Sequence, residues 1–410
     1  ALQKWQALPM LEQPVAAGEM SPVINPAEPK DIVGYVREAT PREVEQALES
    51  AVNNAPIWFA TPPAERAAIL HRAAVLMESQ MQQLIGILVR EAGKTFSNAI
   101  AEVREAVDFL HYYAGQVRDD FANETHRPLG PVVCISPWNF PLAIFTGQIA
   151  AALAAGNSVL AKPAEQTPLI AAQGIAILLE AGVPPGVVQL LPGRGETVGA
   201  QLTGDDRVRG VMFTGSTEVA TLLQRNIASR LDAQGRPIPL IAETGGMNAM
   251  IVDSSALTEQ VVVETPVNIT PRTRFGPVID SEAKANIERH IQTMRSKGRP
   301  VFQAVRENSE DAREWQSGTF VAPTLIELDD FAELQKEVFG PVLHVVRYNR
   351  NQLPELIEQI NASGYGLTLG VHTRIDETIA QVTGSAHVGN LYVNRNMVGA
   401  VVGVQPFGGF

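Results

Sequence analysis

Two polar side chains lie where they could take part directly in a reaction. Asn139 lies in the proline-bounded turn SPWNFP, and a rigidly held amide N–H is what a developing oxyanion needs. Glu243 follows an apolar run in AETGGMN, where a carboxylate with a pKa raised toward neutrality could act as a general base. Each residue also has a purely structural interpretation. Asn139 could belong to a well-packed turn, and Glu243 could simply end a strand.

Two further motifs could bind the phosphates and sugar of a nucleotide. In FTGSTEVA, Gly215 would permit close approach of the backbone, and Ser216 begins a helical stretch whose N-terminus would attract an anion. In AKPAEQTP, Lys162 and Glu165 follow another apolar run and could hold ribose hydroxyls. The alternatives are a plain helix N-cap at Ser216 and a solvated ion pair beside Pro163.

The elements expected around these motifs are those of a two-part α/β protein. Apolar side chains at three- and four-residue spacings predict a helical segment over residues 41–116. From Gly130 onward, helical stretches alternate with short apolar runs, namely PVVCIS, NSVLAKP, VVQLLPG and RGVMFTGS. Because these runs lack strict alternation, we expect a mostly parallel sheet covered on both faces.

A second α/β region is expected from about Pro239. Its predicted strands are IPLIAETGG, NAMIVDSS and a run near residues 318–328, and its main helix covers residues 281–297. The stretch REWQSGTF is expected to be a loop, and DDFAELQKEVFGPV a short helix that leads into a Phe-Gly-Pro turn.

The composition argues against several classes of protein. A chain of 410 residues that is 45% hydrophobic can form two or three domains. Its net charge of −12 disfavours nucleic acid and anionic membranes as partners. Residues 144–160 are apolar but interrupted by polar residues and glycine, so no membrane span is expected. A single cysteine, Cys134, and no recognisable secretory leader favour a cytoplasmic location. The scattered histidines do not indicate a metal site.

Taken together, the motifs resemble the aldehyde dehydrogenase superfamily over almost the whole chain. The matching stretches are SPWNFPL, AKPAEQTP, AGVPPGVVQLLPG, MFTGSTEV, ETGGMN, EVFGPV, NASGYGLTLG and GNLYVNRNMVGAVVGVQPFGG. The last stretch is similar to the branch that oxidises L-glutamate γ-semialdehyde, formed from 1-pyrroline-5-carboxylate, in bacterial proline catabolism. The resemblance implies the aldehyde dehydrogenase fold, with a Rossmann-like NAD-binding domain and an α/β catalytic domain.

The resemblance also implies roles for individual residues. Asn139 would donate to the oxyanion, and Glu243 would activate the water that hydrolyses a thioester. Phe140 would contact the substrate, while backbone N–H groups of Gly399 and Ala400 would anchor its α-carboxylate. The residues implied in NAD binding are Ser136 and Trp138, Lys162 and Glu165 at the adenosine ribose, Gly215 and Ser216 at the pyrophosphate, and Glu337 and Phe339 at the nicotinamide ribose and ring. The family uses no metal.

One essential residue of the family is missing from this sequence. In the family, a cysteine thiolate downstream of the acid that matches Glu243 attacks the aldehyde. Residues 254–280, SSALTEQVVVETPVNITPRTRFGPVID, contain no cysteine, although GPVID matches the family again. Cys134 lies in an apolar run and is expected to be a buried small hydrophobe. Either the printed sequence joins two stretches of a longer chain, or the molecule is a genuine deletion variant.

We therefore predict an NAD-dependent dehydrogenase of L-glutamate γ-semialdehyde. Its expected parts are a helical segment with the NAD-binding domain (1–240), a catalytic domain incomplete around residues 264–275 (241–395), and a truncated return toward the NAD-binding and oligomerisation region (396–410). Expected partners are a small aldehyde, an FAD-containing proline dehydrogenase region of the same parent polypeptide, and further copies in a homo-oligomer. The alternatives are a catalytically dead NAD-binding scaffold and a dehydrogenase for another aldehyde.

Overall fold

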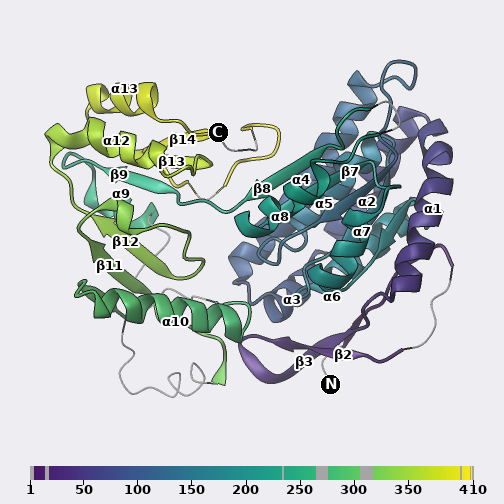
Figure 1. Cartoon of the computed structure of the whole chain (residues 1–410), viewed down its shortest axis with the longest axis horizontal. Helices are drawn as coiled ribbons and strands as arrows, with labels where there is room; N and C mark the ends of the chain where they lie inside the picture. Colours follow the sequence, from purple (N-terminus) through teal and green to yellow (C-terminus); the bar gives the residue numbers. More distant parts are fainter. Residues whose placement is uncertain are drawn as a thin grey trace. The chain divides into compact units, whose positions relative to one another are not determined.

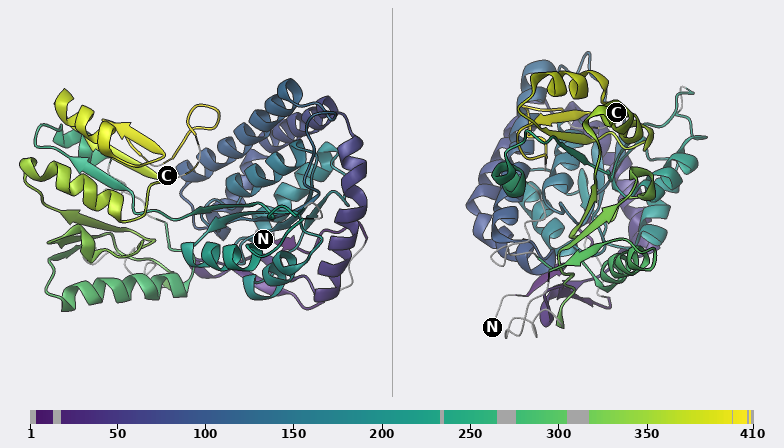
Figure 2. Two further views of the ribbon diagram at one scale, coloured as in Figure 1. Left: turned by 45° about the horizontal axis from the view of Figure 1, so that its top comes forward. Right: turned by 90° about the vertical axis from the view of Figure 1, so that its left-hand side faces the viewer.

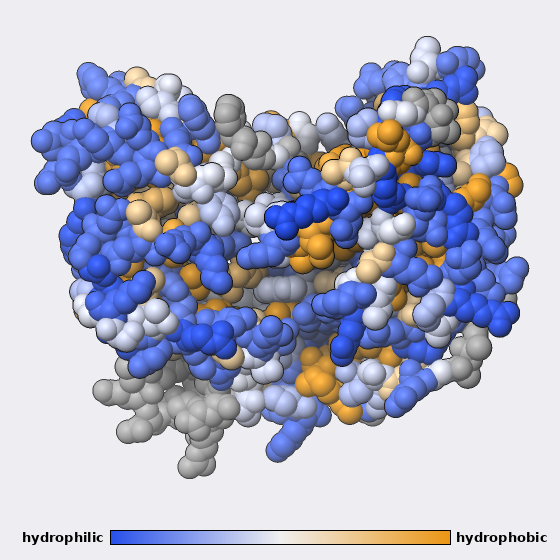
Figure 3. All heavy atoms as spheres, viewed as in Figure 1, coloured by the Kyte–Doolittle hydropathy of each residue, from blue (hydrophilic) through white to orange (hydrophobic). Residues whose placement is uncertain are grey.

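The computed structural model describes residues 4–13, 18–232, 235–264, 276–304, 317–397, 399–406 and 408. The chain divides into two compact units, unit 1 (Ala1–Thr244) and unit 2 (Gly245–Phe410), each with its own sheets and apolar cores. Figures 1 and 2 show the elements of both units. On the face drawn in Figure 3 most side chains are hydrophilic, and apolar groups occur in small patches.

Unit 1 begins with a small sheet that the sequence did not lead us to expect. Its strand order is β1-β3-β2, with β1 parallel and β2 antiparallel to β3. Gly34 is needed in β3, because a Cβ there would overlap the backbone of Trp5 in β1. The prediction had implied that the helical segment opens the unit. This sheet comes before it instead. The strands are β1 (Trp5–Ala7), β2 (Ser21–Asn25) and β3 (Glu28–Val36).

The helical segment predicted over residues 41–116 is confirmed as four successive helices. Thr40 caps the first helix, and its hydroxyl accepts the N–H of Glu43 while the Glu43 side chain returns to the Thr40 backbone. Thr95 caps the fourth helix in a similar way by accepting the N–H of Asn98. The helices are α1 (Pro41–Ala60), α2 (Pro63–Ser79), α3 (Met81–Glu91) and α4 (Phe96–Asp120).

A five-stranded parallel sheet forms the centre of unit 1 and confirms the strands predicted from PVVCIS, NSVLAKP, VVQLLPG and RGVMFTGS. Its fifth strand comes from IPLIAETGG, which was expected to open the second region from about Pro239. That boundary was wrong, because this strand pairs with the strand of RGVMFTGS and unit 1 extends to Thr244. The strand order is β6-β5-β4-β7-β8, so the direction in which strands are added reverses between β4 and β7. In order, its strands and the helices that follow them are β4 (Pro131–Ile135), α5 (Ala143–Ala154), β5 (Ser158–Lys162), α6 (Pro168–Ala181), β6 (Val188–Leu190), the π-helix η1 (Gly195–Gly199), α7 (Ala200–Gly204), β7 (Gly210–Gly215), α8 (Thr217–Ile227) and β8 (Leu240–Thr244).

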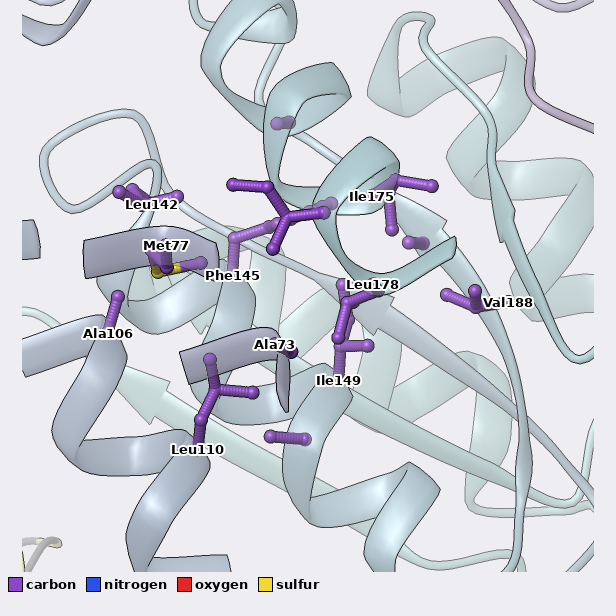
Figure 4. Close-up of a cluster of buried hydrophobic side chains, with 14 of the residues drawn as sticks. Ala73, Met77, Ala106, Leu110, Leu142, Phe145, Ile149, Ile175, Leu178 and Val188 are labelled. Atoms are coloured by element: carbon purple, nitrogen blue, oxygen red, sulfur yellow. The ribbon is translucent and has the colours of Figure 1, made fainter. Parts of the chain in front are cut away.

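Side chains alternate between the two faces of this sheet, and both faces are covered. Val132 and Cys134 of β4 lie in the core formed with α2, α4, α5 and α6, part of which Figure 4 shows. Val133 points to the opposite core, formed with α1, α7 and α8. Cys134 is fully buried and burial raises the pKa of its thiol, which confirms that it is a core residue. No helix among the described residues is long and apolar enough to cross a membrane.

Unit 2 contains two three-stranded sheets with the orders β14-β13-β9 and β10-β11-β12. The predicted main helix is confirmed as α10, and the predicted short helix is a single 3-10 turn, η2. Residues 305–316 lie outside the description, as do residues 265–275. The elements are β9 (Ala249–Val252), α9 (Thr258–Glu264), α10 (Ser281–Ser296), β10 (Val301–Gln303), β11 (Thr324–Leu328), η2 (Phe331–Glu333), β12 (Val342–Val346), η3 (Arg350–Gln352), α12 (Leu353–Ala362), β13 (Thr368–His372), α13 (Asp376–Ser385) and β14 (Asn390–Val393).

A buried carboxyl at the end of α3 makes the stability of unit 1 depend on pH. Glu91 is 1% exposed and accepts the N–H groups of Leu169 and Ile170 at the start of α6, at 2.7 and 2.9 Å. Burial raises its pKa from 4.5 to about 8, against the effect of the two donors. The folded state therefore holds this proton more tightly, and stability falls as pH rises from about 4.5 to about 8, by roughly 4 kcal/mol.

Replacing Glu91 with glutamine is expected to remove that part of the pH dependence. The free energy of unfolding would be measured in urea from about pH 5 to about pH 9, a range that spans the pH at which folded Glu91 loses its proton. It should fall less steeply with pH in Glu91→Gln than in the unchanged chain. Glu78→Gln, at an exposed position of α2, should reproduce the unchanged profile. Parallel profiles for the chain and Glu91→Gln would contradict the assignment.

Candidate functional site

The residues predicted to bind a nucleotide in unit 1 gather at the carboxyl edge of its parallel sheet. Ser136 follows β4, Lys162 ends β5, and Gly215 ends β7. Gln148 of α5 links the two central strands at this edge by donating to the carbonyl of Ile135 and to the hydroxyl of Thr214, at 3.3 and 3.0 Å. In open α/β sheets this edge, where the strand order reverses, is the usual ligand crevice.

The turn that carries Asn139 is held in place by buried charges on α4 and just before it. One carboxylate oxygen of Glu102 accepts the N–H groups of Leu142 and Ala143, at 2.8 and 3.3 Å, and so caps α5. The other oxygen pairs with Lys94, whose ammonium lies 4.3 Å from the centre of the Phe140 ring. Asn139 and Phe140 therefore lie in a turn anchored on both sides.

Neither Glu102 nor Lys94 was a predicted site residue. A signal was present in the sequence, because Glu102 lies on the apolar stripe of α4 together with Ala99, Val103 and Ala106. A charged residue on such a stripe is buried only when it has partners. Its partners lie in the loop before α4 and at the start of α5, and no local pattern identifies them.

The alternative of a solvated pair fails for Lys162, which is buried, while Glu165 is exposed. Lys162 is 3% exposed and donates to the carbonyl of Pro163 at 3.1 Å, while Glu165 accepts the N–H of Gly195 at 2.8 Å. Burial lowers the pKa of Lys162, and the carboxylates of Glu165, Glu196 and Glu38 act against that shift. Gly199 lies beside the Lys162 stem, where a Cβ would be in ordinary contact with it at 3.5 Å. A buried ammonium with few protein acceptors fits a ligand with hydroxyl groups.

The start of α8 lies at the same edge as Lys162. The hydroxyl of Ser216 accepts the N–H of Val219 at 3.3 Å, so its side chain is an N-cap, as the alternative interpretation held. Gly215 is packed closely, because a Cβ there would lie 2.6 Å from the Phe213 ring. After β4, the buried hydroxyl of Ser136 has no hydrogen-bond partner among the described residues. An unpartnered buried hydroxyl beside a helix N-terminus fits a phosphate or sugar ligand.

Glu243 lies on β8 with Thr214 of β7 beside it in register. Its carboxyl is about half-buried, and burial raises its pKa above the ordinary value. A carboxylate with a raised pKa at the edge of a crevice is suited to accept a proton from water.

Among the remaining predicted residues, Trp138 belongs to unit 1, and the others belong to unit 2. Glu337 lies against Gly245, and a Cβ at residue 245 would overlap the Glu337 carboxylate unless that side chain moved. Phe339 is 47% exposed. The hydroxyl of Tyr392 donates to the carbonyl of Gly399 at 3.2 Å, which ties the segment carrying Gly399 and Ala400 to β14. Trp138, in the turn after β4, is partly buried.

Comparison with known proteins places the chain in a family. A model described as "Aldehyde dehydrogenase family" matches residues 15–268 and residues 255–410. This chain belongs to the aldehyde dehydrogenase family. The bifunctional protein PutA of Escherichia coli is 88% identical over 452 positions, which cover all of this chain and 34% of the relative. The chain thus spans about a third of that relative's length.

Shorter relatives of the family are matched over most of their length. 1-Pyrroline-5-carboxylate dehydrogenase 2 of Bacillus subtilis is 34% identical, over 94% of this chain and 84% of the relative. The solved structure of a Thermus 1-pyrroline-5-carboxylate dehydrogenase with bound NAD superposes with a TM-score of 0.88 at 35% identity, covering 99% of this chain and 88% of that one. The predicted aldehyde dehydrogenase fold is therefore confirmed.

The same comparisons locate the break in the family pattern. The alignment with the E. coli protein has 452 positions against 410 residues here, so at least 42 positions of that relative have no counterpart in this chain. The family model stops at residue 268 and its second match begins at residue 255, so the discontinuity falls in this region. This is where the sequence lacks the expected cysteine.

Proposed function

We propose that the chain is the dehydrogenase module of a bifunctional proline-catabolic protein. In complete form this module oxidises L-glutamate γ-semialdehyde to L-glutamate with NAD. The observation that carries the proposal is the 88% identity to a protein named bifunctional PutA. It is supported by the match to a protein named 1-pyrroline-5-carboxylate dehydrogenase 2 over 94% of this chain and 84% of that protein. A proline dehydrogenase region in the parent polypeptide is part of the proposal.

In the proposed NAD site, unit 1 supplies the groups that hold the dinucleotide. Lys162 and Glu165 bind the adenosine ribose, and the start of α8 at Gly215 and Ser216 faces the pyrophosphate. The buried Ser136 hydroxyl is available to a further oxygen of the ligand. The family resemblance assigns Glu337 and Phe339 to the nicotinamide end, and it assigns Trp138 to cofactor binding as well. When bound, NAD accepts the hydride.

In the proposed chemistry, this chain's own residues orient the substrate and move a proton. The Asn139 amide donates to the oxygen that becomes negative when a thiolate adds to the aldehyde. Glu243 takes a proton from the water that hydrolyses the thioester, which its raised pKa favours. Backbone N–H groups of Gly399 and Ala400 receive the α-carboxylate, and Phe140 lies against the substrate chain. The thiolate has to come from the missing segment.

A second candidate function follows from that missing segment. Without a nucleophile, the chain would bind NAD and turn nothing over, which is the scaffold hypothesis. Restoring the segment and supplying NAD with glutamate semialdehyde tests the enzymatic function. NAD binding by the chain itself tests the proposed cofactor site.

Replacing Lys162 with methionine is expected to weaken NAD binding by about tenfold to a hundredfold. The substitution keeps the buried stem and removes a charged donor, and hydrogen bonds of charged groups contribute about 1.5–3 kcal/mol. Binding would be measured by calorimetric titration of the chain with NAD. Lys30→Met, at an exposed position of β3, should bind like the unchanged chain. Equal affinities for Lys162→Met and the unchanged chain would rule out this ribose site.

A further inference from the structure

Two histidines face each other across α2 and α4, away from the proposed NAD site. The Nδ1 atoms of His71 and His111 are 2.9 Å apart, and the ring centres are 5.1 Å apart with the rings tilted by 41°. His111 is exposed and His71 partly buried. Because 40 residues separate them in the chain, no short ligand spacing marked this pair in the sequence.

The geometry of the pair is close to that of two ligands on one metal ion. Zinc–nitrogen bonds of about 2.0–2.1 Å at a tetrahedral angle place two nitrogens about 3.3 Å apart. The observed separation is a few tenths of an ångström shorter, and a small rotation of the exposed His111 ring would make up the difference. Burial lowers the pKa of His71, with His111 and then Arg118 adding to the shift.

The charges around the pair do not exclude a cation. Arg118 is the cation whose charge contributes to the lowered pKa of His71. Its guanidinium donates to the Asp119 carboxylate at 2.7 and 2.9 Å, and the negative charge of Asp119 offsets that of Arg118. Asp108 lies three residues before His111, on the same side of α4, and is exposed.

A second histidine pair provides an internal contrast. The Nε2 atoms of His290 and His344 are also 2.9 Å apart, but both residues are partly buried. Burial, then Lys297 and Lys336, lower the pKa of His290, so cations already act on this pair. A dication would have less room for water ligands here and would be repelled by the two lysines. This pair is accounted for by one ring donating to the other.

We propose that His71 and His111 form a two-histidine site for a divalent transition-metal ion, completed by water. Imidazole nitrogens suit zinc, copper and nickel. Among the described residues no group of three or more His, Cys, Asp or Glu side chains converges, so this is a site with two protein ligands. A bound ion would cross-link α2 and α4, which pack along much of their length in the helical layer of unit 1.

The test is titration of the untagged chain with zinc chloride, followed by calorimetry at pH 7. One site is expected in the unchanged chain, and His71→Ala or His111→Ala should each weaken it by about tenfold or more, because either change leaves a single ligand. His290→Ala should leave zinc binding unchanged. NAD titration of the same variants should give unchanged affinity, which separates this site from the proposed function.

Three outcomes would overturn the proposal. The first is that the unchanged chain does not bind zinc. The second is that binding survives the loss of either His71 or His111. The third is that binding is lost in His290→Ala. Circular dichroism checks that each variant is folded. His111→Gln offers a second variant at the exposed position if His71→Ala proves unstable, and it should weaken binding to the same degree.

Discussion

Inserting the segment that the E. coli relative has and this chain lacks is expected to create an active dehydrogenase. The unmodified chain should bind NAD without turnover, because no thiolate is available to attack the aldehyde. Removal of a catalytic nucleophile typically costs on the order of 10⁴-fold or more in rate, so restoring it should raise NADH formation from glutamate semialdehyde by at least that factor. The measurement is the increase in NADH absorbance with time.

The control is the same insertion with its cysteine changed to alanine. That variant restores the missing residues without the thiol, so it should bind NAD and remain inactive. An aldehyde of similar length without the α-carboxylate should react more slowly in the active chain, since the Gly399 and Ala400 backbone would have nothing to hold. Comparable turnover by the unmodified chain would contradict the assignment of the nucleophile to this segment, and equal rates with both aldehydes would favour another substrate.

The described part of unit 2 shows the effects expected of a missing neighbour. The discontinuity falls within residues 255–268, a range that includes α9, and the preceding strand β9 is an end strand of its three-stranded sheet. On the adjacent strand β13, both ring nitrogens of His372 and the hydroxyl of Thr368 are buried without a hydrogen-bond partner among the described residues. Each such group costs about 1–3 kcal/mol. The insertion is therefore expected to raise the stability of unit 2 as well as its activity.

Local patterns were sufficient to predict much of this molecule. The runs PVVCIS, NSVLAKP and RGVMFTGS are strands because a parallel sheet covered on both faces needs continuous apolar stretches. The four helices from Pro41 follow from apolar spacing and from the caps at Thr40 and Thr95. The family, read from motifs and their order, is confirmed by the comparisons.

Features that depend on contacts between distant residues could not be predicted in this way. Strands β1 and β2 have only three and five residues, and the pairing of β1 to β3 is set by tertiary contacts that leave no helical or alternating pattern. The anchoring of the Asn139 turn depends on Glu102, which lies 40 residues before its partner Leu142. The roles assigned to Glu243, Lys162 and the other site residues rest on family resemblance and stay predictions.

A buried arginine is the position in unit 1 where a single substitution should cost the most stability. Arg66 of α2 is 1% exposed and donates to the carbonyl of Ala154 at the end of α5, at 3.0 Å. It also donates to the carbonyls of Phe59 and Thr61 and to the side chain of Asn123. These bonds join the α1–α2 connection to the end of α5.

Arg66→Met is expected to lower the free energy of unfolding by about 3–5 kcal/mol. The methionine fills much of the same volume, so the loss comes from carbonyls left buried without donors. Urea unfolding measures the change. Arg118→Met removes an exposed arginine that pairs with its neighbour Asp119, and no measurable change is expected there, because exposed pairs contribute little. If Arg66→Met lowered the free energy of unfolding no more than Arg118→Met does, water would be replacing the guanidinium as the hydrogen-bond donor. The surrounding carbonyls would then be accessible to solvent in the folded variant.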